Sequence, residues 1–199
     1  MNRGSEVRGA FINSAIRVTA DQGIQNATTK ALSKDSGLSE VYIYRYFKDK
    51  DDLFRQAFYS LDKELTYVMI SAFKKVNQQQ TNVKSGFQAI YHDFWQFCLG
   101  DMKKCSFFIQ YYYSTNYQGE SDGERKAIYQ PVLDLVSPAF AEGTDAWVEL
   151  NHMYDIIFPK MLRVIRGTLA NNKDTEEGVY RDIVLMEERN MLWNKVFDK

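Results

Sequence analysis

The chain has 199 residues, of which 45% are hydrophobic, 26% charged and 15% aromatic, and its formal net charge is −1. This composition indicates a soluble globular protein with one large domain or two smaller ones. It argues against a membrane protein, because no apolar run approaches the ~18 residues of a membrane span. The N-terminal residues lack the apolar stretch of a secretory signal, so we expect a cytoplasmic protein with no membrane partner.

Helical patterning runs through the whole chain. Proline occurs only three times, and no segment keeps the alternation of apolar and polar residues that is typical of strands. The sequence therefore predicts an all-α fold of about nine helices. The expected helices cover residues 5–22, 28–36, 39–46, 49–79, 83–99, 102–117, 122–140, 145–170 and 175–198.

The second and third expected helices are short and meet across a tight turn. Thr28 is a suitable N-cap for the second helix, and Gly37 is suited to the left-handed conformation that ends it. Ser39 can cap the third helix, and Asp49 can cap the fourth. These signals predict a helix, a short turn and a second helix between residues 28 and 46.

The third helix carries more aromatic and cationic side chains than it can bury. Ile43 and Phe47 lie four residues apart on one side, where they can anchor the helix to the two before it. The remaining side chains spread over the other sides: Glu40, Val41, Tyr42, Arg45 and Tyr46. A second helix anchored in this way is typical of proteins that read the DNA major groove. A surface helix with a solvated charged face is the alternative, and the spacing alone leaves both readings open.

The stretch TTKALSKDSGLSEVYIYRYFKDKDDLF resembles the helix-turn-helix of the TetR family of bacterial transcriptional repressors. The matching positions are Thr28-Thr29, Gly37-Leu38-Ser39, Ile43-Tyr44, Tyr46-Phe47, Lys50-Asp51 and Leu53. The resemblance covers about 30 residues in register. It implies a three-helix DNA-binding domain over residues 1–50 and a larger helical domain for ligand binding and dimerisation over residues 51–199.

The resemblance also implies a DNA-binding surface. Residues expected near base edges or the phosphate backbone are Thr29, Lys30, Ser39, Glu40, Val41, Tyr42, Tyr44, Arg45, Tyr46 and Lys50. Arginine can pair with guanine, and a carboxylate can accept a hydrogen bond from cytosine. Three residues depart from the family pattern: Val41 replaces a small residue, Tyr46 replaces histidine, and Glu40 repels phosphate. These departures leave the operator sequence open.

An aromatic stripe lies on the helices expected after residue 83. Its members, taken as candidate ligand-binding residues, are Tyr91, Phe94, Trp95, Cys98, Phe107, Tyr111 and Tyr154. Such side chains suit a planar or cationic ligand, but a stripe at helical spacing is more often core than pocket. Both readings stay open. His92 and His152 are either ligand contacts or satisfied structural histidines.

The last two expected helices, near residues 145–170 and 175–198, are rich in apolar residues. The final one is apolar on more than one side, so it needs its own core and a second partner. In the resembled family these helices pair with a second subunit. We therefore expect a homodimer through these two segments.

The residues and the resemblance together predict a ligand-responsive repressor that binds a palindromic DNA operator as a dimer and is released by a small apolar, aromatic or cationic effector. We expect no enzyme, because the motifs of hydrolases, nucleotide-binding proteins and metalloproteases are missing. We expect no metal and no cofactor, since the chain has two histidines and two cysteines without zinc spacing. Cys98 and Cys105 are expected to be reduced and buried. The alternative is a helical small-molecule-binding protein that has lost operator binding.

Overall fold

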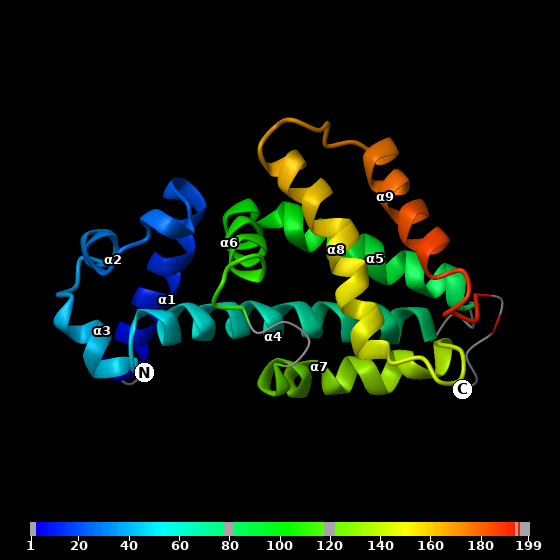
Figure 1. Cartoon of the computed structure of the whole chain (residues 1–199), viewed down its shortest axis with the longest axis horizontal. Helices are drawn as coiled ribbons and strands as arrows, with labels where there is room; N and C mark the ends of the chain where they lie inside the picture. The colour runs from blue at the N-terminus through cyan, green and yellow to red at the C-terminus, as the bar shows by residue number, and fades with distance from the viewer. Residues whose placement is uncertain (1–2, 78–81, 118–121, 194, 196–199) are drawn as a thin grey trace. The chain divides into compact units, whose positions relative to one another are not determined.

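The computed structural model describes residues 3–77, 82–117, 122–193 and 195. Over these residues the chain is mainly helical, and Phe140 and Met191 form an isolated antiparallel β-bridge. The α-helices in Figure 1 are α1 (Arg3–Gln22), α2 (Thr29–Ser36), α3 (Val41–Tyr46), α4 (Lys50–Asn77), α5 (Val83–Gly100), α6 (Met102–Tyr112), α7 (Gly123–Val136), α8 (Ala146–Ile165) and α9 (Lys173–Met186). The predicted all-α fold of about nine helices is confirmed for the part of the chain that is described.

The helices form two compact units, and the division falls within α4 after Asp62. The first unit holds the described residues of Met1–Asp62 and Asp101–Gly119, and the second those of Lys63–Gly100 and Glu120–Lys199. The functional boundary expected after residue 50 coincides with the start of α4 and stays a prediction.

The first unit is built around α1, which packs against α2, α3 and α6. Phe11 and Ala15 of α1, Leu32 of α2 and Ile43 of α3 are fully buried, so the apolar stripes of three short elements share one core. Gln110 of α6 is tied to the end of α1, because its side-chain amide donates to the Thr19 carbonyl at 3.2 Å. Its Oε1 also accepts the backbone N–H of Ile24 at 3.0 Å.

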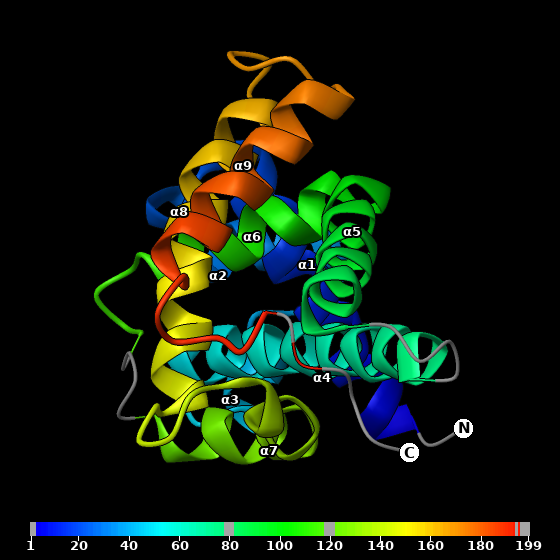
Figure 2. The same ribbon diagram turned by 90° about the vertical axis from the view of Figure 1, so that its right-hand side faces the viewer.

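The second unit contains the C-terminal part of α4 together with α5, α7, α8 and α9. Helix α9 packs against α5 and α8, and α7 packs against α8; α8 and α9 lie side by side in Figure 1 and Figure 2. The fully buried side chains of this unit include Trp95, Trp147, Tyr154 and Phe158. Both cysteines are buried and carry free thiols, as expected.

The last helix is shorter than predicted. Helix α9 ends at Met186, and the described residues from 187 to 193 form turns and extended chain instead of continuing to residue 198. The prediction was wrong because Met191 and Leu192 meet their apolar and backbone partners in an extended conformation. In this conformation Met191 pairs with Phe140, and the Leu192 N–H donates to the Ala139 carbonyl at 2.7 Å.

Candidate functional site

The turn between α2 and α3 is held by local side chains. The Thr28 hydroxyl accepts the N–H of Ala31, and Gly37 has a φ of 70°, so both predicted signals are confirmed. Ser33 donates to the Leu38 carbonyl at 2.6 Å and closes the turn from inside. The predicted side-chain cap at Ser39 is wrong, because α3 begins after Glu40 and has no side-chain cap. The start of α3 is therefore set by backbone bonds.

Helix α3 has one buried side and one exposed side. Ile43 is fully buried and Phe47, the residue that follows the helix, is 3% exposed, as the spacing predicted. Val41 is 73% exposed and Tyr44 is 61% exposed, and Arg45 is exposed as well. Two apolar anchors thus leave a row of large side chains directed away from the core.

Two neighbours fix the orientation of α3. The Arg8 guanidinium of α1 donates to the Tyr46 carbonyl at 2.6 Å and lies 4.9 Å from the centre of the Phe47 ring. It also donates to the side chain of Gln56 in α4. Arg8 therefore joins three helices at the end of α3. Sequence reasoning missed this role because a single arginine on a first helix has no distinctive spacing.

Side-chain hydrogen bonds also hold the connection from α3 to α4. Asp49 Oδ1 accepts the N–H of Asp52 at 2.7 Å, as predicted for the N-cap of α4, and Asp52 Oδ2 accepts the N–H of Lys48 at 3.0 Å. Burial works to raise the pKa of Asp52, but the Lys48 N–H and the Gln56 and Arg55 side chains outweigh it and hold the pKa below its ordinary value. The carboxylate therefore stays charged and keeps the first turn of α4 in place.

The ten predicted DNA-binding residues all lie in the first unit, on α2, the α2–α3 turn, α3 and the start of α4. Exposed members are Lys30, Ser39, Val41, Tyr44 and Arg45; half-buried members are Thr29, Glu40, Tyr42, Tyr46 and Lys50. Several of them contact each other. The Tyr42 and Tyr46 rings stack with centres 6.3 Å apart, and the Arg45 guanidinium lies 5.9 Å from the centre of the Tyr46 ring. The structure thus gathers these residues on one contiguous part of the unit.

Glu40 has a partner that the sequence did not indicate. The Thr29 hydroxyl donates to Glu40 Oε1 across the α2–α3 turn. Both residues were expected to face DNA. Because they are hydrogen-bonded to each other, each one limits the side-chain conformations of the other. A hydroxyl donor also satisfies part of a carboxylate that would otherwise face phosphate alone.

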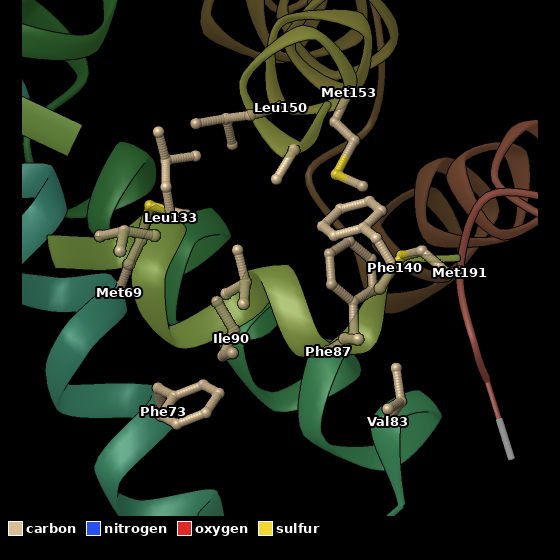
Figure 3. Close-up of a pocket in the computed structure, with 14 residues that line it drawn as sticks. Met69, Phe73, Val83, Phe87, Ile90, Leu133, Phe140, Leu150, Met153 and Met191 are labelled. Atoms are coloured by element: carbon tan, nitrogen blue, oxygen red, sulfur yellow. The ribbon is translucent and has the colours of Figure 1, made fainter. Parts of the chain in front are cut away.

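The second unit contains an enclosed pocket (Figure 3) lined by fourteen residues that are all apolar. They come from six segments: α4 (for example Met69), α5 (Phe87), α7 (Leu133), the α7–α8 connection (Phe140), α8 (Met153) and the chain after α9 (Met191). The cavity has a volume of about 50 Å³. Pockets for drug-sized ligands measure at least about 300 Å³. Side chains must therefore move before such a ligand can enter.

None of the seven candidate ligand-binding residues lines this pocket. Phe107 and Tyr111 lie in the first unit, where the Tyr111 ring packs 4.7 Å from that of Phe58. The other five lie in the second unit, where the Phe94 and Tyr154 rings stack 5.8 Å apart. The signal for the pocket was the series Val83, Phe87, Ile90 on α5, which has helical spacing but few aromatic residues. A ligand-binding role for the seven residues stays a prediction.

Tyr91 borders a separate surface groove between α5 and α9, with a volume of about 430 Å³. Its hydroxyl donates to the Glu176 carbonyl at 3.0 Å, and burial raises the pKa of Tyr91 far above its ordinary value. His92 in the same groove lies 2.6 Å from Glu176 Oε1, and His152 lies 3.1 Å from Glu149 Oε2. Each histidine therefore has an acidic partner within the protein.

The described residues contain neither a metal-binding group nor a helix that could cross a membrane. No group of three or more histidine, cysteine, aspartate or glutamate side chains among the described residues is placed to hold a metal ion. Within the same residues, every helix is too short or too polar to cross a membrane.

Comparison with known families agrees with this geometry. Residues 11–57, which span α1 to the first turns of α4, match the family model described as "Bacterial regulatory proteins, tetR family". Over these residues the chain is therefore similar to regulators of the TetR family. The matched residues include the buried anchors of α3 and all ten candidate DNA-binding positions.

Curated relatives match about a third of the chain. The nucleoid occlusion factor SlmA of Haemophilus ducreyi is 32% identical over 68 residues, which cover 34% of this chain and 34% of that protein. The match therefore spans about a third of the length of the curated relatives.

Solved structures resemble the chain over almost its full length. A TetR family transcription regulator from Marinobacter aquaeolei has a TM-score of 0.72 at 16% identity and covers 97% of this chain and 98% of its own. The regulator FadR from Bacillus subtilis, solved in complex with stearoyl-CoA, has a TM-score of 0.62 at 18% identity, with 88% and 97% covered. At these identities the likeness shows the fold, an N-terminal helix-turn-helix followed by a larger helical region.

Proposed function

We propose that this protein is a ligand-responsive transcriptional repressor that binds a palindromic DNA operator as a homodimer. The observation that carries the proposal is α3, a short helix anchored by Ile43 and Phe47 whose exposed side presents Val41, Tyr44 and Arg45. A helix anchored in this way can enter the major groove without loss of core packing. The match of residues 11–57 to the TetR family model supports the same reading.

The surface residues divide by the group that each can contact. Arg45 suits the O6 and N7 acceptors of guanine, and the exposed methyl groups of Val41 suit a thymine methyl. Lys30 and Glu40 are also assigned to base edges, and Tyr42 to bases or backbone. The backbone set is Thr29, Ser39, Tyr44, Tyr46 and Lys50, each of which can donate to phosphate oxygens. In a dimer, two such surfaces would meet major grooves ~34–36 Å apart.

We further propose that the effector is an uncharged, largely apolar molecule held in the pocket of the second unit. The lining contains no charged side chain and no side-chain hydrogen-bonding group, so it offers nothing to a charged headgroup. Met69, Met153 and Met191 are flexible and can rearrange around a chain-like or planar ligand. The related FadR structure contains stearoyl-CoA, whose acyl part is a ligand of this chemical type.

Dimerisation is proposed through α8 and α9. Val179, Tyr180 and Ile183 of α9 are buried in their own unit, whereas Leu185 is 71% exposed on the same helix. Leu185 also borders a groove between the end of α8 and α9 that includes Leu169. An apolar side chain beside a groove is a surface that a second copy can cover.

The decisive experiment is selection from a pool of random DNA duplexes, with Arg45→Ala in parallel. We expect a palindromic consensus for the natural protein, and relaxed preference at one position of each half-site for the variant. Lys74→Ala, which removes an exposed cation in the last turn of α4, outside α8 and α9, is the matched control and should leave the consensus unchanged. Loss of specificity in both variants, or a consensus that is the same in all three proteins, refutes the assignment of Arg45 to a base.

The alternative function is a small-molecule-binding protein that has lost operator binding, and Glu40 on the α3 surface supports it. Salt dependence separates the two. Each phosphate neutralised contributes roughly −0.9 to the slope of log K against log salt, whereas a protein that does not bind DNA shows no binding to analyse. Absence of any enriched duplex at low salt would favour the alternative.

A further inference from the structure

The chain that follows α9 crosses the edge of the apolar pocket. We call residues 187–193 the strap. The Asn190 carbonyl accepts the N–H of Ala141 at 2.8 Å, and the Leu192 N–H donates to Ala139 at 2.7 Å, so the strap pairs with the α7–α8 connection. On its other side the Trp193 carbonyl accepts the N–H of Lys84, in the first turn of α5, at 3.1 Å. The strap therefore joins two of the segments that line the pocket.

Side chains of the strap complete the pocket. Met191 is 6% exposed and belongs to the lining, where Figure 3 shows it beside Phe140 and near Phe87. The Trp193 ring lies edge-on to the ring of Phe87, with centres 5.5 Å apart. If the strap moved away, the pocket would lose Met191 from its wall and Phe87 would lose its outer neighbour.

The strap is also the lining segment whose release disturbs the helices least. Its bond to Lys84 satisfies an N–H in the first turn of α5, which has no partner within its own helix. Water can satisfy such a group equally well when the strap leaves. Moving α5, α7 or α8 would instead break the packing of their buried faces.

A buried carboxyl group lies at the base of the strap. The backbone carbonyl of Glu187 accepts the N–H groups of Asn190 at 3.1 Å and Met191 at 3.0 Å, and Nε1 of Trp193 at 3.2 Å. The Glu187 side chain is fully buried, and the side chains that act on its carboxyl by hydrogen bonding are Asn190 in the strap and Glu149 on α8. The charged groups that act on it belong to α8: the carboxylate of Glu149 and, beyond it, the imidazole of His152.

We propose that the strap is the gate of the apolar pocket and that the buried carboxyl of Glu187 is its latch. When this carboxyl is protonated, it is neutral and can stay buried, and the turn that holds Met191 and Trp193 is intact. When it releases its proton to solvent, a buried carboxylate faces Glu149, the Asn190 side chain compensates only part of the cost, and the group is stabilised by moving into water. The same residue organises the turn, so exposure of its side chain releases the strap.

The titration of Glu187 supports this arrangement. Burial raises the pKa of Glu187 to about 7, the negative charge of Glu149 adds to the rise, and His152 opposes it. The group therefore changes charge close to neutral pH. A gate of this kind favours the closed pocket below neutral pH and the open pocket above it.

The gate rests on the proposed effector pocket, but it can be tested without DNA. Phe140 and Met191 form a bridge flanked by the hydrogen bonds of Ala141 and Leu192, which makes them a non-hydrogen-bonded antiparallel pair. Such pairs have Cα atoms about 4.5 Å apart, within the range of a disulfide. A Phe140→Cys, Met191→Cys double variant would thus lock the strap when oxidised and free it when reduced.

The readout is uptake of the neutral dye Nile red, whose fluorescence increases in apolar surroundings. We expect uptake by the oxidised variant to be about tenfold slower or more than by the same protein reduced with dithiothreitol, since a locked gate removes the open fraction. A Met153→Trp variant, which fills the pocket, should abolish uptake and place the dye there. Equal rates in the oxidised and reduced forms overturn the gate, and so does a reduced form that takes up no dye.

The latch is tested by the pH dependence of the same rate. Uptake by the natural protein should accelerate from pH 6 to pH 8, and Glu187→Gln should show no such change. Should that variant fail to fold, Glu149→Gln is expected to move the transition to lower pH, because it removes a negative charge beside Glu187. A pH dependence unaltered by both changes overturns the latch. Gated dye uptake without any effect of apolar ligands on operator binding would leave the gate standing and refute the proposed effector response.

Discussion

The buried carboxyl of Glu187 makes a quantitative prediction about stability. Its pKa is raised from 4.5 to about 7, a difference that corresponds to about 3 kcal/mol at 1.36 kcal/mol per pKa unit. Because the folded protein binds this proton more tightly than the unfolded chain, the destabilisation is absent below the unfolded pKa. It grows as pH rises and is complete above the folded pKa. About 2–3 kcal/mol of it falls between pH 5 and pH 8.

Glu187→Gln removes the titration but keeps a polar side chain of similar shape. The natural protein should therefore lose about 2–3 kcal/mol more unfolding free energy between pH 5 and pH 8 than the variant does. Any desolvation of the glutamine itself is the same at both pH values, so it cancels in this comparison. The other titrating groups cancel in the same way.

Urea unfolding followed by tryptophan fluorescence measures this difference. Trp95, Trp147 and Trp193 all lie in the unit that contains Glu187, so the signal reports on that unit. With a slope of roughly 2–3 kcal/mol per molar urea, the midpoints of the two proteins should diverge by about 1 M over this pH range. If both stability profiles run parallel from pH 5 to pH 8, the Glu187 carboxyl is ionised in the folded protein and the reasoning fails.

Three further substitutions test other parts of the structure. Ile43→Ala should lower the unfolding free energy by about 2–4 kcal/mol, because Ile43 is fully buried. Its control, Val41→Ala at a 73% exposed position, should change the unfolding free energy by less than about 0.5 kcal/mol. Equal losses in denaturation experiments would contradict the assigned faces of α3. Arg125→Lys should destabilise the second unit by about 2 kcal/mol or more, since lysine cannot reproduce a buried planar guanidinium, and a thermal midpoint unchanged from the natural protein would argue against this. Leu185→Glu should yield monomers in sedimentation velocity with an unchanged circular dichroism spectrum, because it places a charge in the proposed dimer interface; a dimer of undiminished affinity would exclude α9 from that interface.

The helix-turn-helix could be predicted from the sequence because its signals are local. The Thr28 cap, the left-handed Gly37 and the Asp49 cap each act on residues within a few positions of themselves. The anchors Ile43 and Phe47 follow from helical spacing alone. Arg8 could not be predicted, because its partners on α3 and α4 are 38 and 48 residues away in the chain.

The end of α9 could not be predicted for a related reason. Apolar residues continue from Val179 to Leu192 with spacing that suits a helix, and no glycine or proline interrupts them. The helix nevertheless ends at Met186, because the strap finds backbone partners in the α7–α8 connection about fifty residues earlier in the chain. The spacing of apolar residues indicates which side chains will be buried. It does not indicate whether the backbone will form its hydrogen bonds within a helix or with a distant segment.

The prediction for α5 selected a face of the helix next to the one that lines the pocket. Tyr91, Phe94, Trp95 and Cys98 share a face whose centre lies roughly 60° around the helix from that of Val83, Phe87 and Ile90, at 100° per residue. The aromatic face attracted attention because tyrosine and tryptophan suit planar and cationic ligands. The face that borders the cavity carries fewer aromatic rings and no polar tips.

One of the aromatic residues that suggested a cationic ligand, Tyr154, already contacts a cation of the protein itself. The Arg125 guanidinium is fully buried, lies 5.1–5.5 Å from the ring centres of Tyr129, Trp147 and Tyr154, and donates to Asn151 Oδ1 at 2.9 Å. A ligand cation at Tyr154 would have to displace this arginine from a position where it is charged and enclosed, which is strongly unfavourable. The apolar pocket requires no such exchange, since a hydrocarbon ligand gains contacts there as Phe and Met side chains rearrange. Among the ligand classes that the sequence left open, the packing of Arg125 therefore favours an uncharged effector.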